Sequence, residues 1–330
     1  MNRPIPVSGI GERPLIKRIS DIFNTGCNPD ILIGSGTDDC AVIDISDEDC
    51  MVITTDMLHR KTDFPPQMNP WQIGWMSAAV NFSDVASMGA RPVGFLSAMG
   101  FSKDTDLSFV EDICKGMDDC ARFCGTSVIG GDIDTHDELT ITGTALGRVQ
   151  KSELLTRKGA RVGDKVCVTG LAGSAGAALH AIENDIDIPD SLLNKLLTPI
   201  PRVNEAMKLA KSGAVTCMMD TSDGLAMSLH DLADLNEVGF RIDEASLPIQ
   251  KEVSEFVTSD PGSLTELALY TGGDFELLFT VSSCMLEAAQ SACYLNVIGE
   301  VVAREVGIGL MCRNGENLTI NRKGYLQLGD

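Results

Sequence analysis

Basic side chains are scarce in this chain of 330 residues. Lysine and arginine together number 26, whereas aspartate and glutamate number 47, which gives a formal net charge of −21 at pH 7. A surface of this charge repels phosphate backbones and anionic lipid headgroups. The composition therefore argues against a nucleic-acid or membrane partner, and any phosphate ligand would have to bind through cations.

Long apolar runs, an export signal and paired cysteines are also missing. No stretch of about 18 apolar residues occurs, and the N-terminal sequence MNRPIPVSGIGERP has no apolar core. The eleven cysteines include no CxxC pair, and most lie in apolar segments such as CAVIDI, where cysteine acts as a small hydrophobe. We expect reduced core thiols, with Cys114, Cys120 and Cys124 on one helical stripe, and a cytoplasmic location.

Familiar nucleotide and nucleophile motifs are absent. The four histidines form no Ser-His-Asp or Cys-His arrangement, which disfavours a nucleophilic hydrolase. The segment GLAGSAG (170–176) precedes a predicted helix and could hold a phosphate with its backbone amides. It has neither the GKS or GKT of a Walker A loop nor the dinucleotide spacing. The same glycines would allow close helix–strand packing, and both interpretations stay open.

The length and the 44% hydrophobic content predict two domains, over residues 1–150 and 151–330. A polar, glycine-containing segment near 150–163 separates them. Apolar periodicity predicts an alternation of helices and strands, which indicates an α/β fold with α+β layers in both domains. The predicted helices include 14–23, 71–88, 106–124, 203–212 and 222–235, and the predicted strands include 40–45, 51–55, 93–101, 138–149, 214–220 and 276–281.

Several aspartates lie where apolar residues on both sides predict burial: Asp38, Asp39, Asp56, Asp84, Asp132, Asp220 and Asp223. A buried carboxylate must be protonated, paired or bound to a cation, and these segments contain almost no lysine or arginine. Thr54, Thr55 and Ser222 add hydroxyl oxygens beside them. Because oxygen ligands without imidazole or thiolate favour Mg²⁺ or Ca²⁺, the pattern predicts cations that bridge to a nucleotide.

Each of these acids also has an ordinary structural alternative. Asp223 could cap a helix, and Asp84 could be a polar position that faces a groove. On the helix predicted around Asp84, the side chains of Ser77, Asn81, Asp84 and Met88 share one face, which predicts a polar stripe along a cavity. The repetition of the pattern favours cation binding over several unrelated roles.

Six segments, in this order along the chain, carry motifs that resemble those of thiamine-monophosphate kinases, within the aminoimidazole-ribonucleotide synthetase superfamily. They are VITTDML (52–58), AAVNFSDVASMGARP (78–92), IGGD (129–132), LTRKGARVGDKVCVTG (155–170), DTSDGLAMSL (220–229) and TGGDFELLFTV (271–281). The segment GTDDCAVI (36–43) fits the opening motif of that family with Thr37 in place of glycine. The resemblance implies an N-terminal domain that binds Mg-ATP and dimerises through its sheet, and a C-terminal domain that completes the cleft.

The resemblance also implies roles for single residues. The Mg²⁺ ligands would be Asp38, Thr54, Thr55, Asp56, Asp84, Asp132, Asp220 and Asp223, of which Asp56, Asp84, Asp132 and Asp220 would be catalytic. The residues that contact ATP would be Gly131, Asp132, Arg157 and Ser222. Asp63, Gly273 and Tyr325 would contact the acceptor, thiamine monophosphate.

The implied reaction is direct in-line transfer of the γ-phosphoryl group of ATP to thiamine monophosphate, catalysed by a Mg²⁺-dependent homodimer. Two positions depart from the family pattern, because Asp63 stands where a histidine is common and Gly273 where a glutamate is common. The departures concern the acceptor. Two alternatives are an ATP-dependent synthetase of the same superfamily that acts on another small substrate, and a nucleotide-binding regulator without activity.

Overall fold

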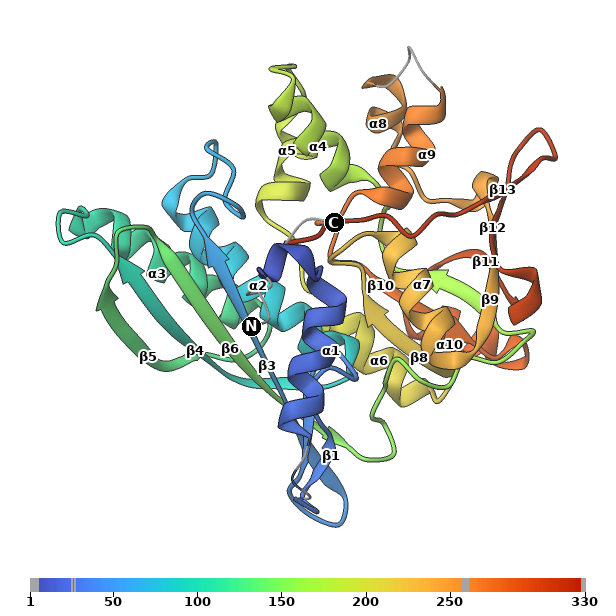
Figure 1. The fold of residues 1–330 in the computed structure, drawn as a ribbon, viewed down its shortest axis with the longest axis horizontal. Coiled ribbons are helices and arrows are strands. Elements are labelled where there is room, and N and C mark those ends of the chain that lie inside the picture. Colours follow the sequence, from blue (N-terminus) through green and yellow to red (C-terminus); the bar gives the residue numbers. More distant parts are fainter. Residues whose placement is uncertain (1–5, 25, 27, 257–260, 328–330) are drawn as a thin grey trace, which may run out of the picture.

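Two β-sheets with helices packed against them make up the structure, a computed structural model that describes residues 6–24, 26, 28–256 and 261–327 (Figure 1). The first sheet ends at Gln150 and the second begins at Lys165, with an irregular segment between them. The largest apolar cluster continues from the first domain into helix α6 (Val203–Ser212) and strand β10 (Leu277–Val281) of the second. The predicted α/β architecture is confirmed.

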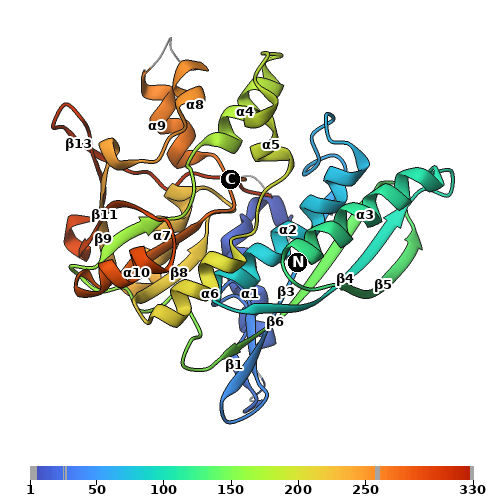
Figure 2. The same ribbon diagram turned by 180° about the vertical axis from the view of Figure 1, so that it is seen from behind.

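The N-terminal sheet has six strands in the order β1-β2-β3-β6-β4-β5. Helices α2 and α3 lie on one of its faces (Figure 2). The pairing is antiparallel except between β4 and β5, and β5 is an edge strand. The elements are α1 (Glu12–Phe23), β1 (Ile31–Ile33), β2 (Ala41–Asp44), β3 (Asp49–His59), α2 (Pro70–Ser87), β4 (Arg91–Phe101), α3 (Leu107–Phe123), β5 (Val128–Thr135) and β6 (Thr140–Gln150).

The C-terminal sheet has seven strands in the order β13-β12-β9-β11-β7-β10-β8. Its strands are β7 (Lys165–Val168), β8 (Val215–Asp220), β9 (Val238–Asp243), β10, β11 (Asn296–Ala303), β12 (Ile308–Met311) and β13 (Asn317–Thr319). Its helices are α4 (Ser174–Glu183), α5 (Asp190–Leu197), α6, α7 (Leu225–Asn236), α8 (Lys251–Phe256), α9 (Pro261–Tyr270) and α10 (Leu286–Ala292). Strand β8, which ends at Asp220, lies at the edge nearest the first domain (Figure 1).

Helix α2 is the central element of the first domain, and local chemistry fixes where it begins. Asn69 and Gln72 form a reciprocal capping box around Pro70 at the first helical position. Its packing on α3 depends on two glycines. A Cβ atom at Gly74 would lie 1.8 Å from the carbonyl oxygen of Ile113, and one at Gly116 would lie 1.9 Å from that of Trp71.

The predicted polar stripe on α2 does not line a cavity along its length. The side chain of Ser77 donates to the carbonyl of Ile73, and Asn81 Oδ1 accepts a hydrogen bond from the backbone N–H of Asp56 on β3 at 3.1 Å. Met88 is fully buried. The stripe therefore attaches the helix to strand β3, and Asp84 alone of the four faces other acids.

Helix α1 forms as predicted, and Ser20 is its single buried residue among those described, whereas Ile16, Ile19 and Phe23 are exposed. One prediction about the cysteines needs correction. All ten cysteines within the described ranges are free. Cys114 is exposed, since six residues of helix rotate it away from the buried Cys120 and Cys124. Cys27 lies outside the described residues.

No helix in the described part of the chain is both long enough and apolar enough to cross a membrane.

Helices α2 and α3 touch at Gly116, where there is no room for a side chain. We therefore expect Gly116→Ala to lower the free energy of unfolding by about 2 kcal/mol or more, because the methyl group forces the two helices apart. Urea unfolding of both proteins measures the loss. The exposed neighbour Lys115 serves as the control, since Lys115→Ala should change the free energy of unfolding by less than about 0.5 kcal/mol. Equal stability of Gly116→Ala and the wild type would show that the helices have room to separate.

Candidate active site

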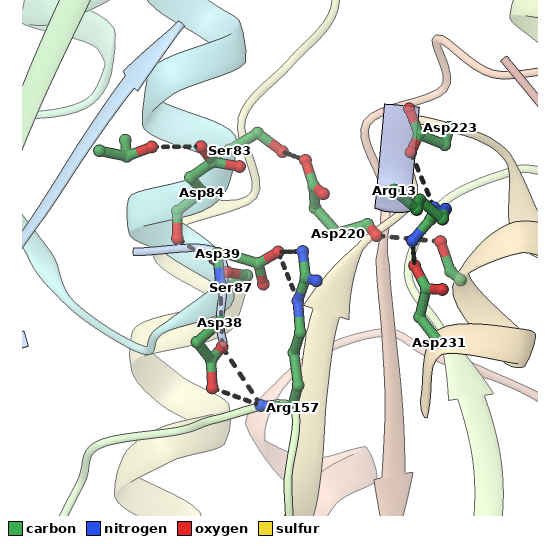
Figure 3. Close-up of polar contacts among 12 residues, drawn as sticks. Arg13, Asp38, Asp39, Ser83, Asp84, Ser87, Arg157, Asp220, Asp223 and Asp231 are labelled. Carbon is green, nitrogen blue, oxygen red and sulfur yellow. Dashed lines mark hydrogen bonds and ion pairs between the residues drawn. The ribbon is translucent and has the colours of Figure 1, made fainter. Parts of the chain in front are cut away.

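Three carboxylates from distant parts of the chain converge where the two domains meet (Figure 3). Asp39 precedes β2, Asp84 lies on α2, and Asp220 ends β8. One carboxylate oxygen from each residue lies within 4.8 Å of the others. This spacing suits three oxygens bound to a common cation.

Asp39 shows most directly that the cluster is suited to a cation. Its side chain is only 1% exposed. The Arg157 guanidinium binds Oδ1, with Nε at 2.9 Å and a second contact from Nη2. The other oxygen, Oδ2, is buried and has no hydrogen-bond donor among the described residues. A buried carboxylate oxygen without a donor is costly, and a divalent cation would satisfy it.

The other two acids of the cluster each accept one short hydrogen bond. Thr54 Oγ1 donates to Asp84 at 2.6 Å, and Ser83 Oγ donates to Asp220 at 2.6 Å. Burial, followed by the nearby Asp56 and Asp220, raises the pKa of Asp84. Burial, followed by Asp39, raises the pKa of Asp220 to about 7. The enclosed site thus disfavours the charged carboxylates in the absence of a cation.

Three further predicted ligands lie close to this cluster. Asp38 accepts the backbone N–H of Arg157, while burial and then Asp39 raise its pKa to about 7. Asp56 lies on β3, and burial followed by Asp39 raises its pKa to about 6. Asp223 forms an ion pair with Arg13, with Oδ2 of the carboxylate 3.2 Å from Nη2 of the guanidinium. Arg13 also pairs with Asp231, so the acids acquire basic partners from segments far away in the sequence.

Two predicted metal ligands are not brought into this cluster. Thr55 follows Thr54 on β3 and points to the opposite face, where its hydroxyl donates to the carbonyl of Gly143. Asp132 was predicted to be buried, but it is exposed on the edge strand β5. The sequence VIGGD is apolar before Asp132, yet an edge strand has no neighbour to cover its far side.

The predicted acceptor residues meet in part. Asp63 Oδ1 accepts hydrogen bonds from the Tyr325 hydroxyl at 3.4 Å and from Gln327 at 3.0 Å, so the loop after β3 holds the C-terminal segment. Burial, then Asp63, raises the pKa of Tyr325 to about 12, which keeps its hydroxyl a donor. Gly273 has φ +95°, and a Cβ there would contact Ala175 and Leu196, so a side chain at 273 would point toward α4 and α5.

The glycine-rich turn 170–176 allows close packing. A Cβ at Gly176 would lie 1.8 Å from the Thr271 hydroxyl. The Asp274 carboxylate accepts hydrogen bonds from the backbone N–H groups of Gly173 and Ala175 at 2.6 and 2.9 Å. These amides at the start of α4, which could have held a phosphate, therefore bind a carboxylate of the chain itself. A cavity of about 520 Å³ beside Asp274 opens toward the start of α2. The packing interpretation of these glycines is therefore the better one.

Arg157 binds Asp39, and Ser222 lies two residues after Asp220. The predicted contacts of these two residues with ATP stay predictions. Two members of the site were not predicted from the sequence. Asp39 was counted among the apolar-flanked acids and not among the ligands, although one of its carboxylate oxygens lies within 4.8 Å of those of Asp84 and Asp220. Arg13 was not singled out, since no local pattern links it to Asp223, 210 residues away. The doubled acid of GTDDCAVI was the available signal for Asp39.

Comparison with known proteins identifies relatives of this chain along most of its length. The family model "AIR synthase related protein, N-terminal domain" matches residues 37–149, and the corresponding C-terminal domain model matches residues 161–310. A thiamine-monophosphate kinase from Escherichia coli K12 is 33% identical over 325 residues, which cover 96% of this chain and 97% of that protein. The one from Methanospirillum hungatei is 42% identical over 254 residues, covering 76% and 82%.

A solved structure described as "AaThiL complexed with AMPPCP and TMP" superposes with a TM-score of 0.85 at 25% identity, covering 99% of this chain and all of that one. Both domains, their order and nearly the full length are thus shared with these proteins. The chain belongs to the thiamine-monophosphate kinase family of AIR synthase related proteins.

Proposed function

We propose that this protein is a Mg²⁺-dependent kinase that transfers the γ-phosphoryl group of ATP to thiamine monophosphate, giving thiamine diphosphate and ADP. The three converging carboxylates, with the donor-less oxygen of Asp39, support this proposal most strongly. The acceptor phosphate is already an anionic nucleophile, so the reaction needs no strong general base. Positioning and charge neutralisation suffice for direct in-line transfer.

Phosphorus NMR of ATP, Mg²⁺, thiamine monophosphate and the protein tests this function. We expect the diphosphate resonances of thiamine diphosphate and ADP to appear together. Asp84→Asn should lower the rate by at least about 100-fold, because one carboxylate of the cation site is lost. The exposed Asp187→Asn is the control and should keep the wild-type rate. Inorganic phosphate in place of thiamine diphosphate would indicate the synthetase chemistry instead.

The residues that would hold Mg²⁺ are Asp39, Asp84 and Asp220, with Asp38 and Asp56 close by. When bound, Mg²⁺ supplies positive charge between two polyanions. Thr54 and Ser83 orient the carboxylates of Asp84 and Asp220 through their hydroxyl groups. The Arg157 guanidinium holds the Asp39 carboxylate in place. Because the Arg157 side chain is partly exposed, it could also contact a bound nucleotide.

The pKa shifts make the effect of Mg²⁺ on stability depend on pH. The folded-state pKa values of Asp38 and Asp220, about 7, exceed the unfolded value near 4, so stability from these groups is complete below pH about 4 and declines as the pH rises through about 7. Mg²⁺ binds the ionised form and reverses the decline.

Mg²⁺ should therefore raise Tm by about 3 °C or more at pH about 8 and by almost nothing at pH about 5. Scanning calorimetry with millimolar Mg²⁺ or EDTA at both pH values measures this. The variant Asp84→Asn should lose most of the rise at the higher pH. An equal rise at both pH values would contradict binding at these carboxylates.

We also propose a homodimer in which each chain completes the site of the other. Three strand spacings, about 14 Å, separate Asp56 from Gly131, because Asp56 pairs with Gly143, Gly143 with Ser97, and Ser97 with Gly131. The next residue, Asp132, pairs with Ala98 and so projects from the opposite face to Asp56. Asp132 of one chain therefore cannot join the acid cluster of that chain.

A second copy would supply Asp132 from its own exposed edge strand. The face of the sheet away from α2 and α3 carries apolar side chains that are open to solvent: Met57 at 56% exposure, Leu96 at 36% and Ile129 at 59%. Burying such a face against its twofold mate stabilises a dimer. This arrangement brings the predicted ATP-contacting pair, Gly131 and Asp132, to the interface where the two sites would lie.

Mixing two inactive variants tests the shared site. Asp84→Asn and Asp132→Asn should each lose at least about 100-fold in activity. After the chains exchange, half of the dimers are mixed, and each mixed dimer holds one site with both aspartates intact. The mixture should regain about a quarter of the wild-type activity.

The control pairs Asp84→Asn with Asp134→Asn, which changes another exposed acid on β5 and should be fully active alone. No recovery in the first mixture, with chain exchange verified by a mass tag on one variant, would place both aspartates in one chain. Light scattering that gives 35.2 kDa would exclude the dimer itself.

The acceptor is assigned to the region where Asp63 and Tyr325 meet. The Asp63 carboxylate is suited to a positively charged thiazolium ring, which would explain a carboxylate at a position where histidine is common. Tyr325 is 41% exposed and offers an aromatic face. The backbone N–H of Gly273 donates a hydrogen bond to the carbonyl of Ser222, which lies between Asp220 and Asp223 in the sequence.

A further inference from the structure

The cavity of about 520 Å³ beside Asp274 has walls from both domains. Trp71 and Trp75 on α2 line it from the first domain, and α5 and the turn before α4 line it from the second (Figure 2). The indole N–H of Trp75 donates to the carbonyl of Pro199 at 2.7 Å, which attaches α2 to the segment after α5. A cavity of this volume accommodates a small organic molecule.

This cavity lies on the opposite side of α2 from the acid cluster. Nine positions along α2 separate Trp75 from Asp84, which corresponds to about two and a half helical turns. The two side chains therefore project in opposite directions. Trp75 packs on Phe123 of α3, with ring centroids 5.7 Å apart, and the Trp71 indole donates to Asp119 of α3 at 2.8 Å. A ligand in this cavity would not contact the proposed cation site.

One wall of the cavity is aromatic. The rings of Trp71 and Trp75 lie side by side, with their centroids 5.2 Å apart, and they are the two tryptophans of the chain. Leu171 and Ile200 add aliphatic surface to the same cavity. Indole rings contribute a large apolar area and pack favourably against other flat rings. The wall is thus suited to a planar ligand.

Ser174, the first residue of α4, brings an unpaired hydroxyl to the cavity. Its side chain is 1% exposed, and Oγ has no hydrogen-bond partner among the described residues. The nearby Asp274 carboxylate accepts the backbone N–H groups of Gly173 and Ala175 and does not accept this hydroxyl. Buried hydroxyl groups nearly always have a partner, and an unpaired one lowers stability. The Ser174 hydroxyl is therefore available to a polar atom of a ligand.

Lys195 on α5 gives the cavity a positive charge that the protein does not offset. Its side chain is half-buried, and its ammonium group forms no ion pair within the part of the chain that the structure describes. Arg202, the other cation in the wall, already pairs with Glu276 and Glu205. The remaining acid, Asp274, is held by the amides at the start of α4. An anionic group of a ligand would complete the environment of Lys195.

We infer that this cavity is a second binding site, which takes a small molecule with a planar ring and one anionic group. The ring lies against Trp71 and Trp75, Lys195 pairs with the anionic group, and the Ser174 hydroxyl hydrogen-bonds a polar atom of the ligand. Because Lys195 supplies the positive charge, binding needs no divalent cation, in contrast to the acid cluster. The ligand would join the two domains, since its contacts come from α2 on one side and from α4 and α5 on the other.

Tryptophan fluorescence of the full-length protein in EDTA tests the inference, because both tryptophans line the cavity. The probes are pyridoxine 5′-phosphate and 4-pyridoxate, each a planar ring with one anionic group, and neutral pyridoxine. We expect saturable quenching, with at least one charged probe binding about 10-fold or more tightly than pyridoxine. The stronger of the two charged probes identifies the preferred anion.

Variants assign the binding to the named residues. Lys195→Gln should weaken the charged probe by about 5- to 20-fold and leave pyridoxine unchanged, because it removes the charge alone. Ser174→Ala should weaken the charged probe by about 3- to 10-fold. Lys103→Gln changes an exposed lysine outside the cavity and should bind all three probes as the wild type does.

Three results would overturn the inference: no saturable quenching of the wild type, equal affinity for charged and neutral probes, or unchanged affinity in Lys195→Gln. Binding that appears only when Mg²⁺ replaces EDTA would also overturn it, because it would place the probe at the acid cluster. The Michaelis constant for thiamine monophosphate should be the same in Lys195→Gln and the wild type. A raised value would make the cavity part of the acceptor site and would refute a separate site. The quenching requires no turnover, so its outcome is independent of the proposed kinase activity.

Discussion

Negative charge enclosed between two domains is the constraint around which this structure is organised. Asp39, Asp84 and Asp220 bring three carboxylates together, and Arg157 offsets the charge of one. Charges of one sign in a poorly solvated space repel each other and lose hydration. The fold tolerates this arrangement because the surrounding elements are tightly packed. A divalent cation placed among these carboxylates would remove both costs together.

The rigidity of α2 determines where the cluster forms. Close contact with α3 at Gly74 and Gly116 sets the height of the helix above the sheet, and Asn81 fixes it against β3. Asp84 is then presented toward the end of β8, where Asp220 lies. Asp39 is positioned differently, by a guanidinium from the segment that links the two domains. The site thus combines two acids on stiff elements with one held by an ion pair.

The amount that could be predicted from the sequence differs between local and distant features. Helix α2, a long apolar segment, and helix α6, an amphipathic one, were placed within a residue or two. Helix α5 and strands β9 and β11 to β13 were missed, because short segments carry little periodicity. The burial of Asp84 and Asp220 followed from their apolar neighbours. The partnership of Arg157 with Asp39 spans 118 residues, and no local pattern reports it. Asp132 is exposed because β5 is the edge strand of its sheet. The order of strands in a sheet depends on contacts between distant segments, so it could not be predicted from the local pattern around Asp132.

The open edge of β5 has a consequence for how this protein behaves in solution. If the edge of one chain completes the site of another, the working unit is a pair, and its abundance depends on the square of the chain concentration when chains are dilute. Specific activity would then fall on dilution while every chain stays folded. The expression level would then affect the total activity in two ways, through the number of chains and through the fraction of chains that are paired.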